Sequence, residues 1–222
     1  MNQDEIVLQA SRHAALSDPV RLQVVMYLRS RDASPAALGE RFEVASNLMA
    51  YHVGVLTRTG LVGRIRSEAD HRRAYLRLLP AGRDMVSKPH IDARRVIFVC
   101  TQNSARSQFA HVLWRRHSTI PSTSAGTRPV SNVHPLARST AASKGFDMEG
   151  LRPRAVNPNE LGQSLVITVC DHADAELAFD GGHLHWSIPD PAESGRSSDF
   201  EMAFDNIAER VRDLADITRE YP

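Results

Sequence analysis

The sequence predicts two domains of different class: a mainly α-helical domain that ends in a β-hairpin, at 1–90, and an α/β domain with a parallel sheet, at 94–222. In the first part, segments with helical spacing of apolar residues precede one alternating segment at 63–78, which is typical of a hairpin. In the second part, short apolar strands alternate with helical segments, which indicates a parallel sheet with helices on both faces. The boundary is expected at 85–95, where Pro89 interrupts a helical pattern.

The composition is that of an ordinary globular protein, and it excludes several classes. Of the 222 residues, 42% are hydrophobic and 24% charged, with 27 Lys/Arg against 26 Asp/Glu. No apolar run approaches the roughly 18–20 residues that span a bilayer, and the polar first residues lack the apolar core of a signal peptide. Two cysteines, Cys100 and Cys170, are too few for a disulfide framework. We therefore expect a cytoplasmic protein with reduced thiols and no membrane partner.

Four helices are expected in the first domain. The first covers 3–15, and a capping residue followed by proline marks two further helix starts, at Pro19 and Pro35. The fourth helix covers about 46–59 and ends at Gly60 in a left-handed cap. The apolar residues expected to face the core are Leu22, Val25, Met26 and Leu28 in the second helix, and Leu48, Met49, Val53 and Leu56 in the fourth.

Strands and helices alternate in the second domain. The expected strands are 96–99, 122–126, 164–170 and a short strand with its loop at 183–191. The expected helices are 106–117, 134–145 and 198–219.

A thiol and an arginine flank the loop that follows the first of these strands, in "VIFVCTQNSARSQ" (96–108). Parallel-sheet enzymes bind ligands at the carboxyl ends of strands, so the loop 101–105 should wrap a helix N-terminus whose N–H groups and dipole attract an anion. The guanidinium of Arg106 can bind two oxygens of a tetrahedral oxyanion at once. The same positive field favours the thiolate of Cys100, a nucleophile toward phosphorus or arsenic.

Polar side chains of the loop have expected supporting roles. The hydroxyl of Ser107 is placed to hydrogen-bond the thiolate, and Asn103 to brace the loop. The expected oxyanion-binding residues are Thr101, Gln102, Asn103, Ser104, Ala105, Arg106 and Ser107. The alternative, that Cys100 is an inert core thiol, stays open on this spacing alone.

Four blocks in this order resemble the low-molecular-weight protein tyrosine phosphatase family and its arsenate reductase branch. The resemblance covers about 94–222, and the blocks are "VIFVCTQNSARSQ" (96–108), "TSAGT" (123–127), "LVITVCDHA" (165–173) and "HWSIPDPAE" (185–193). It implies the low-molecular-weight phosphatase fold, with a four-stranded parallel sheet. It also implies Cys100 as the nucleophile, Arg106 as the oxyanion clamp and Asp190 as the general acid.

The family carries two chemistries on one loop. A phosphatase attacks a phosphoester while Asp190 protonates the leaving oxygen, and the phosphocysteine then hydrolyses. A reductase forms a Cys–arsenate adduct, and a second thiol attacks Cys100 to release arsenite. Cys170 at the end of the third strand favours the reductase, as does Ala192, because tyrosine phosphatases commonly carry an aromatic residue at that position.

One feature counts against a complete thiol relay. The thioredoxin-coupled branch has a further cysteine about seven residues after the second, where this chain has Leu177. We therefore expect no bound cofactor and an external thiol reductant, which is mycothiol, glutathione with glutaredoxin, or thioredoxin. A tyrosine phosphatase and a non-catalytic oxyanion sensor remain the alternatives, and Cys170 can also be read as a buried strand-end residue.

The first domain resembles the ArsR-type repressors over about 10–85. Helix 35–42, a tight turn, helix 46–59 and the hairpin would form a winged helix-turn-helix, whose second helix lies in the major groove. Asn47 is suited to read adenine, and arginines on the wing to reach phosphate or the minor groove. The expected DNA-binding residues are Ser46, Asn47, Ala50, Tyr51, His52, Arg64, Arg66, Arg72 and Arg73. The alternative is a helical protein-interaction module.

The first domain contains no cysteine, so the thiolate sensor site of many ArsR-type proteins is absent. We expect no metal site, because the candidate ligands are few and scattered; they are His13, Asp84 and His90 in one group, and His183 and His185, read as loop residues, in another. The resemblance implies a homodimer through the first domain on palindromic operator DNA, with the first helix and the segment 80–90 at the interface. The expected protein is thus a transcriptional regulator fused to an arsenate reductase.

Overall fold

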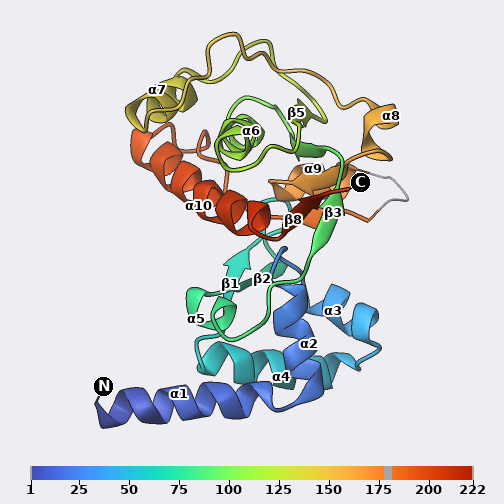
Figure 1. Ribbon diagram of the computed structural model, residues 1–222, viewed down its shortest axis with the longest axis vertical. Coiled ribbons are helices and arrows are strands. Elements are labelled where there is room, and N and C mark those ends of the chain that lie inside the picture. The colour runs from blue at the N-terminus through green and yellow to red at the C-terminus, as the bar shows by residue number, and fades with distance from the viewer. Residues whose placement is uncertain (1, 178–181, 222) are drawn as a thin grey trace. The chain divides into compact units, whose positions relative to one another are not determined.

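The computed structural model describes residues 2–177 and 182–221, and the chain divides into two units, Met1–Pro89 and His90–Pro222. Each unit has a hydrophobic core of its own. Figure 1 shows helices and a small hairpin in the first unit, and a sheet with its helices in the second. Within the described ranges, no helix is both long and apolar enough to cross a membrane.

The first unit consists of four helices, a hairpin and a short fifth helix, which confirms the predicted order of its elements. The helices are α1 (Gln3–Leu16), α2 (Pro19–Tyr27), α3 (Pro35–Phe42), α4 (Ser46–Arg58) and α5 (Pro80–Arg83), and the antiparallel strands are β1 (Val62–Arg66) and β2 (Ala74–Leu78). The side chains of Asp18 and Ser34 cap α2 and α3, each with proline at the first helical position. Gly60 has φ +69°, as its predicted left-handed cap requires.

Three apolar residues of this unit were assigned to the wrong face. Leu22 and Met26 on α2 are exposed, because the buried face of that helix is set by Val24, Val25 and Leu28. Leu48 on α4 is also exposed, because the buried stripe there begins one residue later, at Met49.

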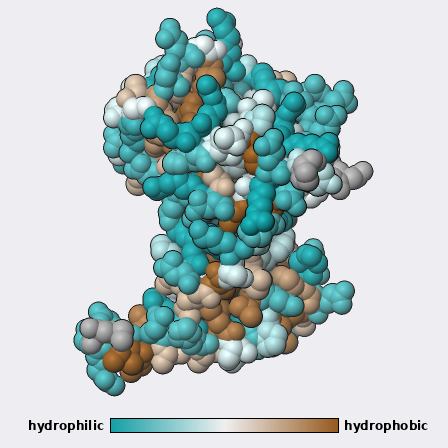
Figure 2. Space-filling view, viewed as in Figure 1, coloured by the Kyte–Doolittle hydropathy of each residue, from teal (hydrophilic) through white to brown (hydrophobic). Residues whose placement is uncertain are grey.

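Helix α1 carries apolar side chains that are largely exposed. Ala15 is its one buried residue, whereas Ile6, Val7 and Leu8 are 44%, 55% and 43% exposed. Figure 2 shows these hydrophobic residues gathered beside the N-terminus. Because Ile6, Val7 and Leu8 are exposed, α1 presents an apolar surface that its own unit does not cover. A helix of 14 residues is also marginal on its own in water.

The second unit contains the predicted four-stranded parallel sheet, in the order β5-β4-β6-β7. Its strands are β4 (Val96–Cys100), β5 (Ser122–Gly126), β6 (Leu165–Thr168) and β7 (Leu184–His185), and its helices are α6 (Arg106–His117), α7 (Pro135–Ser143), α8 (Pro158–Leu161), α9 (Asp171–Glu176) and α10 (Ser197–Ala215). A separate parallel pair joins β3 (Ile91–Ala93) to β8 (Thr218–Glu220). The sequence did not predict this pair; the last helix ends at Ala215 rather than 219, and the chain turns into β8.

The core of the second unit fixes the central strand β4, all five residues of which are buried. The ring of Phe98 lies 6.0 Å from the rings of both Trp114 and Trp186. Phe109 on α6 meets Phe204 on α10 at 5.1 Å. Burial of such side chains stabilises the fold by roughly 1.5–3 kcal/mol each. The strand that ends at Cys100 is therefore rigidly held.

A buried histidine makes the stability of the second unit depend on pH. Burial lowers the pKa of His111 on α6 from 6.5 to about 4, helped by the charges of Arg115 and Arg154. The imidazole, 2.9 Å from the Ser122 hydroxyl, is neutral in the fold. Its contribution to stability is complete above pH 6.5 and is lost as the pH falls toward 4, where the unfolded chain binds the extra proton.

We expect the unfolding temperature to fall between pH 6.5 and 4, and to fall less steeply in His111→Gln, which cannot take up that proton. Thermal unfolding at a series of pH values measures both slopes. His117→Gln, a change at an exposed residue of the same helix, is the control and should keep the wild-type slope. Equal slopes in all three proteins would contradict the assignment.

Candidate active site

The thiol of Cys100 lies at the carboxyl end of β4 and is 2% exposed. Its Sγ accepts a hydrogen bond from the backbone N–H of Asn103 at 3.1 Å and lies 3.0 Å from the hydroxyl of Ser107. Both partners come from the predicted loop and the first turn of α6. The structure therefore brings three predicted site residues together around one sulfur atom.

The backbone of this loop is turned so that its carbonyl groups point outward. Those of Cys100, Thr101, Gln102 and Ser104 accept hydrogen bonds from the N–H groups of Thr127, Arg128, Val130 and His134 respectively, at 2.8–3.2 Å. With the carbonyls engaged from outside, the N–H groups of the loop are left to line its inner side. Successive amides that face one concavity form an anion-binding nest.

Asn103 connects the loop to its surroundings. It is fully buried and has a left-handed backbone, with φ +52°. Its Oδ1 accepts from the backbone N–H of Arg154 at 3.0 Å, and its Nδ2 donates to the Ser107 hydroxyl at 2.8 Å. Because Ser107 accepts there, its own hydrogen is free to be donated to Cys100. A hydroxyl donor stabilises the thiolate form of a cysteine.

Arg106 and Asp190, the predicted clamp and general acid, form an ion pair. The Arg106 side chain is 5% exposed, and its guanidinium donates to the carbonyl of Ile188 at 2.8 Å and to Asp190 Oδ2 at 3.0 Å. The second carboxylate oxygen of Asp190 accepts from the N–H of Ala192. The predicted clamp is thus held beside the loop by residues 188 and 190.

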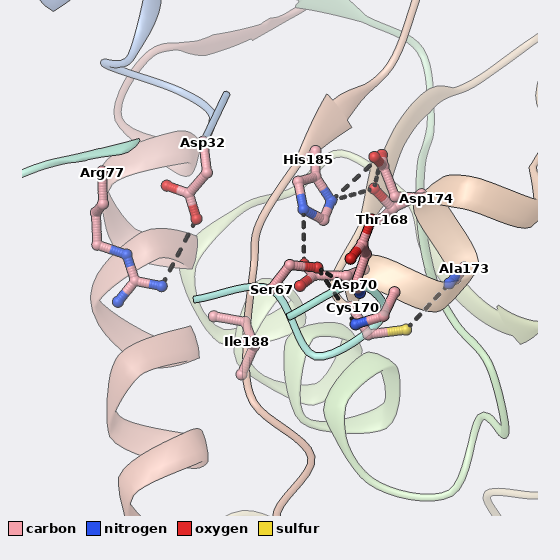
Figure 3. Close-up of polar contacts among 12 residues, drawn as sticks. Asp32, Ser67, Asp70, Arg77, Thr168, Cys170, Ala173, Asp174, His185 and Ile188 are labelled. Carbon is pink, nitrogen blue, oxygen red and sulfur yellow. Dashed lines mark hydrogen bonds and ion pairs between the residues drawn. The ribbon is translucent and has the colours of Figure 1, made fainter. Parts of the chain in front are cut away.

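Cys170 is buried beside the loop, at the start of α9. Its Sγ accepts from the N–H of Ala173 at 3.4 Å, as Figure 3 shows, and lies 3.4 Å from the hydroxyl of Thr101. Burial raises the pKa of Cys170 from 9.0 to about 12; the charge of Arg106 opposes this rise and that of Cys100 adds to it. Both thiols therefore share one electrostatic environment, and Cys170 stays protonated near neutral pH.

The two histidines that were read as loop residues instead hold α9 in place, and for His185 that reading was wrong. His185 belongs to β7, is buried, and lies 3.0 Å from Asp171 and 2.9 Å from the hydroxyl of Thr168. His183 lies 2.7 Å from Asp174. Figure 3 shows the contacts of His185 at the edge of the sheet. In the part of the chain that the structure describes, no group of three or more His, Cys, Asp or Glu residues is arranged to hold a metal ion.

The pKa of Asp174 reflects this network. Burial alone would raise it, but hydrogen bonds from His183 and Thr168 and the charges of both histidines lower it below its usual value. The carboxylate is thus ionised where it contacts His183, and it fixes the helix that begins next to Cys170.

Most residues predicted to bind DNA lie at the surface of the first unit. Ser46, Asn47, Ala50 and Tyr51 on α4 are exposed, as are Arg64, Arg66, Arg72 and Arg73 on the hairpin. His52 was predicted wrongly, because it lies on the buried stripe of α4 and is 5% exposed, with its Nδ1 3.6 Å from Asp18. Arg72 and Arg73 pair with Asp70 in the turn of the hairpin.

Three residues of the site were missed by the sequence analysis: Gly126, Arg154 and Gln108. A Cβ atom on Gly126 would lie 2.6 Å from the carbonyl oxygen of Thr101, so only glycine allows β5 to approach the loop this closely. The signal for Gly126 was its place at the end of a predicted strand, in "TSAGT". The backbone contact of Arg154 leaves no signal in the sequence.

Comparisons with known proteins relate the second unit to one family. Residues 95–221 match the family described as low molecular weight phosphotyrosine protein phosphatase. An arsenate reductase of Bacillus cereus is 31% identical over 126 residues, which cover 54% of this chain and 92% of that protein. An arsenate reductase of Bacillus anthracis is 30% identical over the same length and the same shares.

Solved structures resemble the second unit as well. The arsenate reductase of Archaeoglobus fulgidus DSM 4304 is 28% identical and has a TM-score of 0.48, covering 55% of this chain and 98% of its own. The tyrosine phosphatase amsI of Erwinia amylovora is 14% identical with a TM-score of 0.50, covering 56% of this chain and 92% of its own. At that identity the likeness to the latter is one of fold.

The contact at Gly126 gives a prediction for the loop. Gly126→Ala should weaken the binding of phosphate by at least about tenfold, because the new methyl group displaces Thr101 and the amides beside it. Calorimetric titration with phosphate measures the affinity. Gly162→Ala is the matched control, since a Cβ there meets nothing within 4 Å. Equal affinity in the two variants would show that the loop tolerates the displacement.

Proposed function

The chain belongs to the low molecular weight phosphotyrosine protein phosphatase family through residues 95–221, and from this premise we propose that it couples arsenate reduction to DNA-binding regulation. The family and the arsenate reductase relatives make the second unit an enzyme, with arsenate reduction as its activity and phosphoester hydrolysis as the alternative. The choice of arsenate reduction over hydrolysis rests on the second thiol, Cys170. Its Sγ lies 3.4 Å from the hydroxyl of Thr101, the residue next to Cys100.

The proposed reaction begins with an arsenate ion in the loop. The loop amides and Arg106 hold its oxygens, and the Cys100 thiolate attacks arsenic(V). An arsenic–oxygen bond breaks, and the oxygen leaves as water once protonated. Asp190, beside Arg106, is placed to supply a proton at this step. The product is a Cys100–arsenate adduct.

The second step transfers two electrons. The sulfur of a second thiol attacks Cys100 Sγ, and its proton passes to an oxygen of the departing group. The S–As bond breaks with its electron pair left on arsenic, and arsenite departs. When Cys170 supplies that sulfur, a Cys100–Cys170 disulfide results. Adduct formation removes the thiolate charge of Cys100, which is one of the causes that raise the pKa of Cys170, so the first step favours the second. An external thiol such as mycothiol, glutathione with glutaredoxin, or thioredoxin then reduces the disulfide.

The phosphatase alternative uses the same loop without Cys170. Its supporting observation is the Arg106–Asp190 pair, which keeps an acid at the loop. Against it stands Ala192, a small, half-buried side chain that offers no ring to a phosphotyrosine substrate. A loop that binds an oxyanion without turnover is the third reading.

Two assays on two cysteine variants distinguish these readings. We expect wild type to reduce arsenate when supplied with one of the thiol systems above. Cys170→Ala and Cys170→Ser should both lose that reduction at least about 100-fold, because the second sulfur is missing. Hydrolysis of p-nitrophenyl phosphate should survive in Cys170→Ser, since serine keeps the cap on α9.

Cys100→Ser is the control that should abolish both activities. Fast ester hydrolysis without any reduction would favour the phosphatase. Phosphate binding with neither activity would favour the non-catalytic sensor.

We propose that the first unit is a winged helix-turn-helix that binds DNA as a homodimer. Supporting the DNA contact, α3 ends at Glu43 with a left-handed φ of +55°, which makes the tight turn before α4, and α4 exposes Asn47 and Tyr51. Supporting the dimer, the apolar side chains on α1 are uncovered, and a second copy of the chain would bury them. The unit has no cysteine, so an oxyanion at Cys100 is the proposed effector.

DNA selected from a random duplex library by the full chain provides the test. Asn47→Ala should bind the selected site about tenfold more weakly or worse, in line with the loss of one base contact. Asn159→Ala, an exposed asparagine of the second unit, is the control and should leave the affinity unchanged. Sedimentation should find two chains on each duplex.

The same titration with arsenate present tests the coupling, with Cys100→Ser as its reference. Identical curves for the two proteins, with and without arsenate, would remove the effector role. Failure to select any sequence would remove the DNA-binding role.

A further inference from the structure

Gln108 is a buried polar residue that the proposed reaction does not use. It lies in the first turn of α6 and is 1% exposed. Its Nε2 donates to the backbone carbonyl of Asn103 at 3.1 Å and to the side-chain Oδ1 of the same residue at 3.2 Å. Its own Oε1 has no hydrogen-bond partner among the described residues. A buried acceptor without a partner destabilises the fold, and a methionine of similar length would avoid that cost.

The contacts of Gln108 fix the direction of a hydrogen-bond chain. A backbone carbonyl only accepts, so the amide nitrogen of Gln108 must face Asn103. A backbone N–H only donates, so the N–H of Arg154 and the Nε2 of Gln108 both require Asn103 to present its Oδ1. The Nδ2 of Asn103 is thereby turned toward Ser107.

The chain ends at the reactive sulfur. Ser107 Oγ accepts from Asn103 at 2.8 Å and lies 3.0 Å from Cys100 Sγ. When Cys100 is a thiolate, which can only accept, the Ser107 hydroxyl is the donor to it. Gln108 also holds the carbonyl of Asn103, whose left-handed backbone points the residue's N–H at the same sulfur. Both donors to Cys100 therefore depend on the orientation of Asn103, and Gln108 contacts that residue twice.

We propose that Gln108 is a positioning residue for the Cys100 thiolate. It acts through Asn103, sets the polarity of the Gln108–Asn103–Ser107–Cys100 chain, and touches no substrate. The inference rests on the proposed function, because it requires Cys100 to react as a thiolate. In the described residues, the charged or titratable side chains beside the thiol are Arg106, Asp190 and Cys170. Arg128, His134 and Arg154 also contact the loop, each through its backbone N–H.

The test is the rate at which iodoacetamide alkylates Cys100, measured by mass spectrometry over a range of pH. In Gln108→Met both hydrogen bonds from Nε2 to Asn103 are lost, so Asn103 is less firmly held in the orientation that directs the two donors to Cys100. The midpoint of the pH–rate curve should then rise by about one unit, which makes alkylation about tenfold slower below the midpoint. Gln108→Leu, which likewise has no donor and adds no charge, should raise the midpoint as far.

Gln163→Met, the same substitution at an exposed glutamine of the second unit, is the matched control and should keep the wild-type midpoint. Thermal unfolding identifies which variants are folded, and Gln108→Leu serves if Gln108→Met is not. A wild-type midpoint in either folded variant overturns the inference.

A different result would overturn the proposed function instead. That result is a wild-type Cys100 that alkylates like an ordinary thiol and is not protected by phosphate. The two failures are therefore distinguishable in one experiment.

Discussion

The outward hydrogen bonding of the loop after β4 is the constraint on which the site depends. Four loop carbonyls are engaged by N–H groups of residues 127–134, which follow β5. A peptide group with its carbonyl held outward has its N–H on the other side, so segment 127–134 determines what the loop offers to an anion. The close approach of β5 that brings this segment into place is possible because Gly126 has no side chain.

The same constraint explains why the interior of the loop is polar yet ordered. Asn103 must adopt a left-handed backbone to turn its N–H toward Cys100, a conformation that costs a non-glycine residue about 1–2 kcal/mol. Hydrogen bonds from Arg154 and Gln108, and one to Ser107, satisfy the side chain of Asn103. Buried polar networks stabilise one arrangement when every member has its partner. The exception is Gln108 Oε1, which is buried without a hydrogen-bond partner. In the proposed role of Gln108, this cost is the consequence of holding Asn103 in place.

The sequence predicted the parts of this arrangement that depend on order along the chain. An apolar strand followed by Cys100 and, six residues later, Arg106 was sufficient to place the loop at a helix start. Contacts between distant segments were beyond it: β3 and β8 are three residues each and carry no periodicity, and the pairing of His185 with Asp171 gives no local signal. The prediction of which helix faces are buried was wrong for a related reason. The spacing of apolar residues defines a stripe, but tertiary packing decides which side of α4 is buried, and it buried His52 in place of Leu48.

The Arg106–Asp190 ion pair bears on which anions the loop would favour. With no anion bound, the carboxylate partly neutralises the guanidinium, so a simple monovalent ion gains little by displacing it. A tetrahedral oxyanion gains more, because its other oxygens reach the loop amides at the same time as one or two engage Arg106.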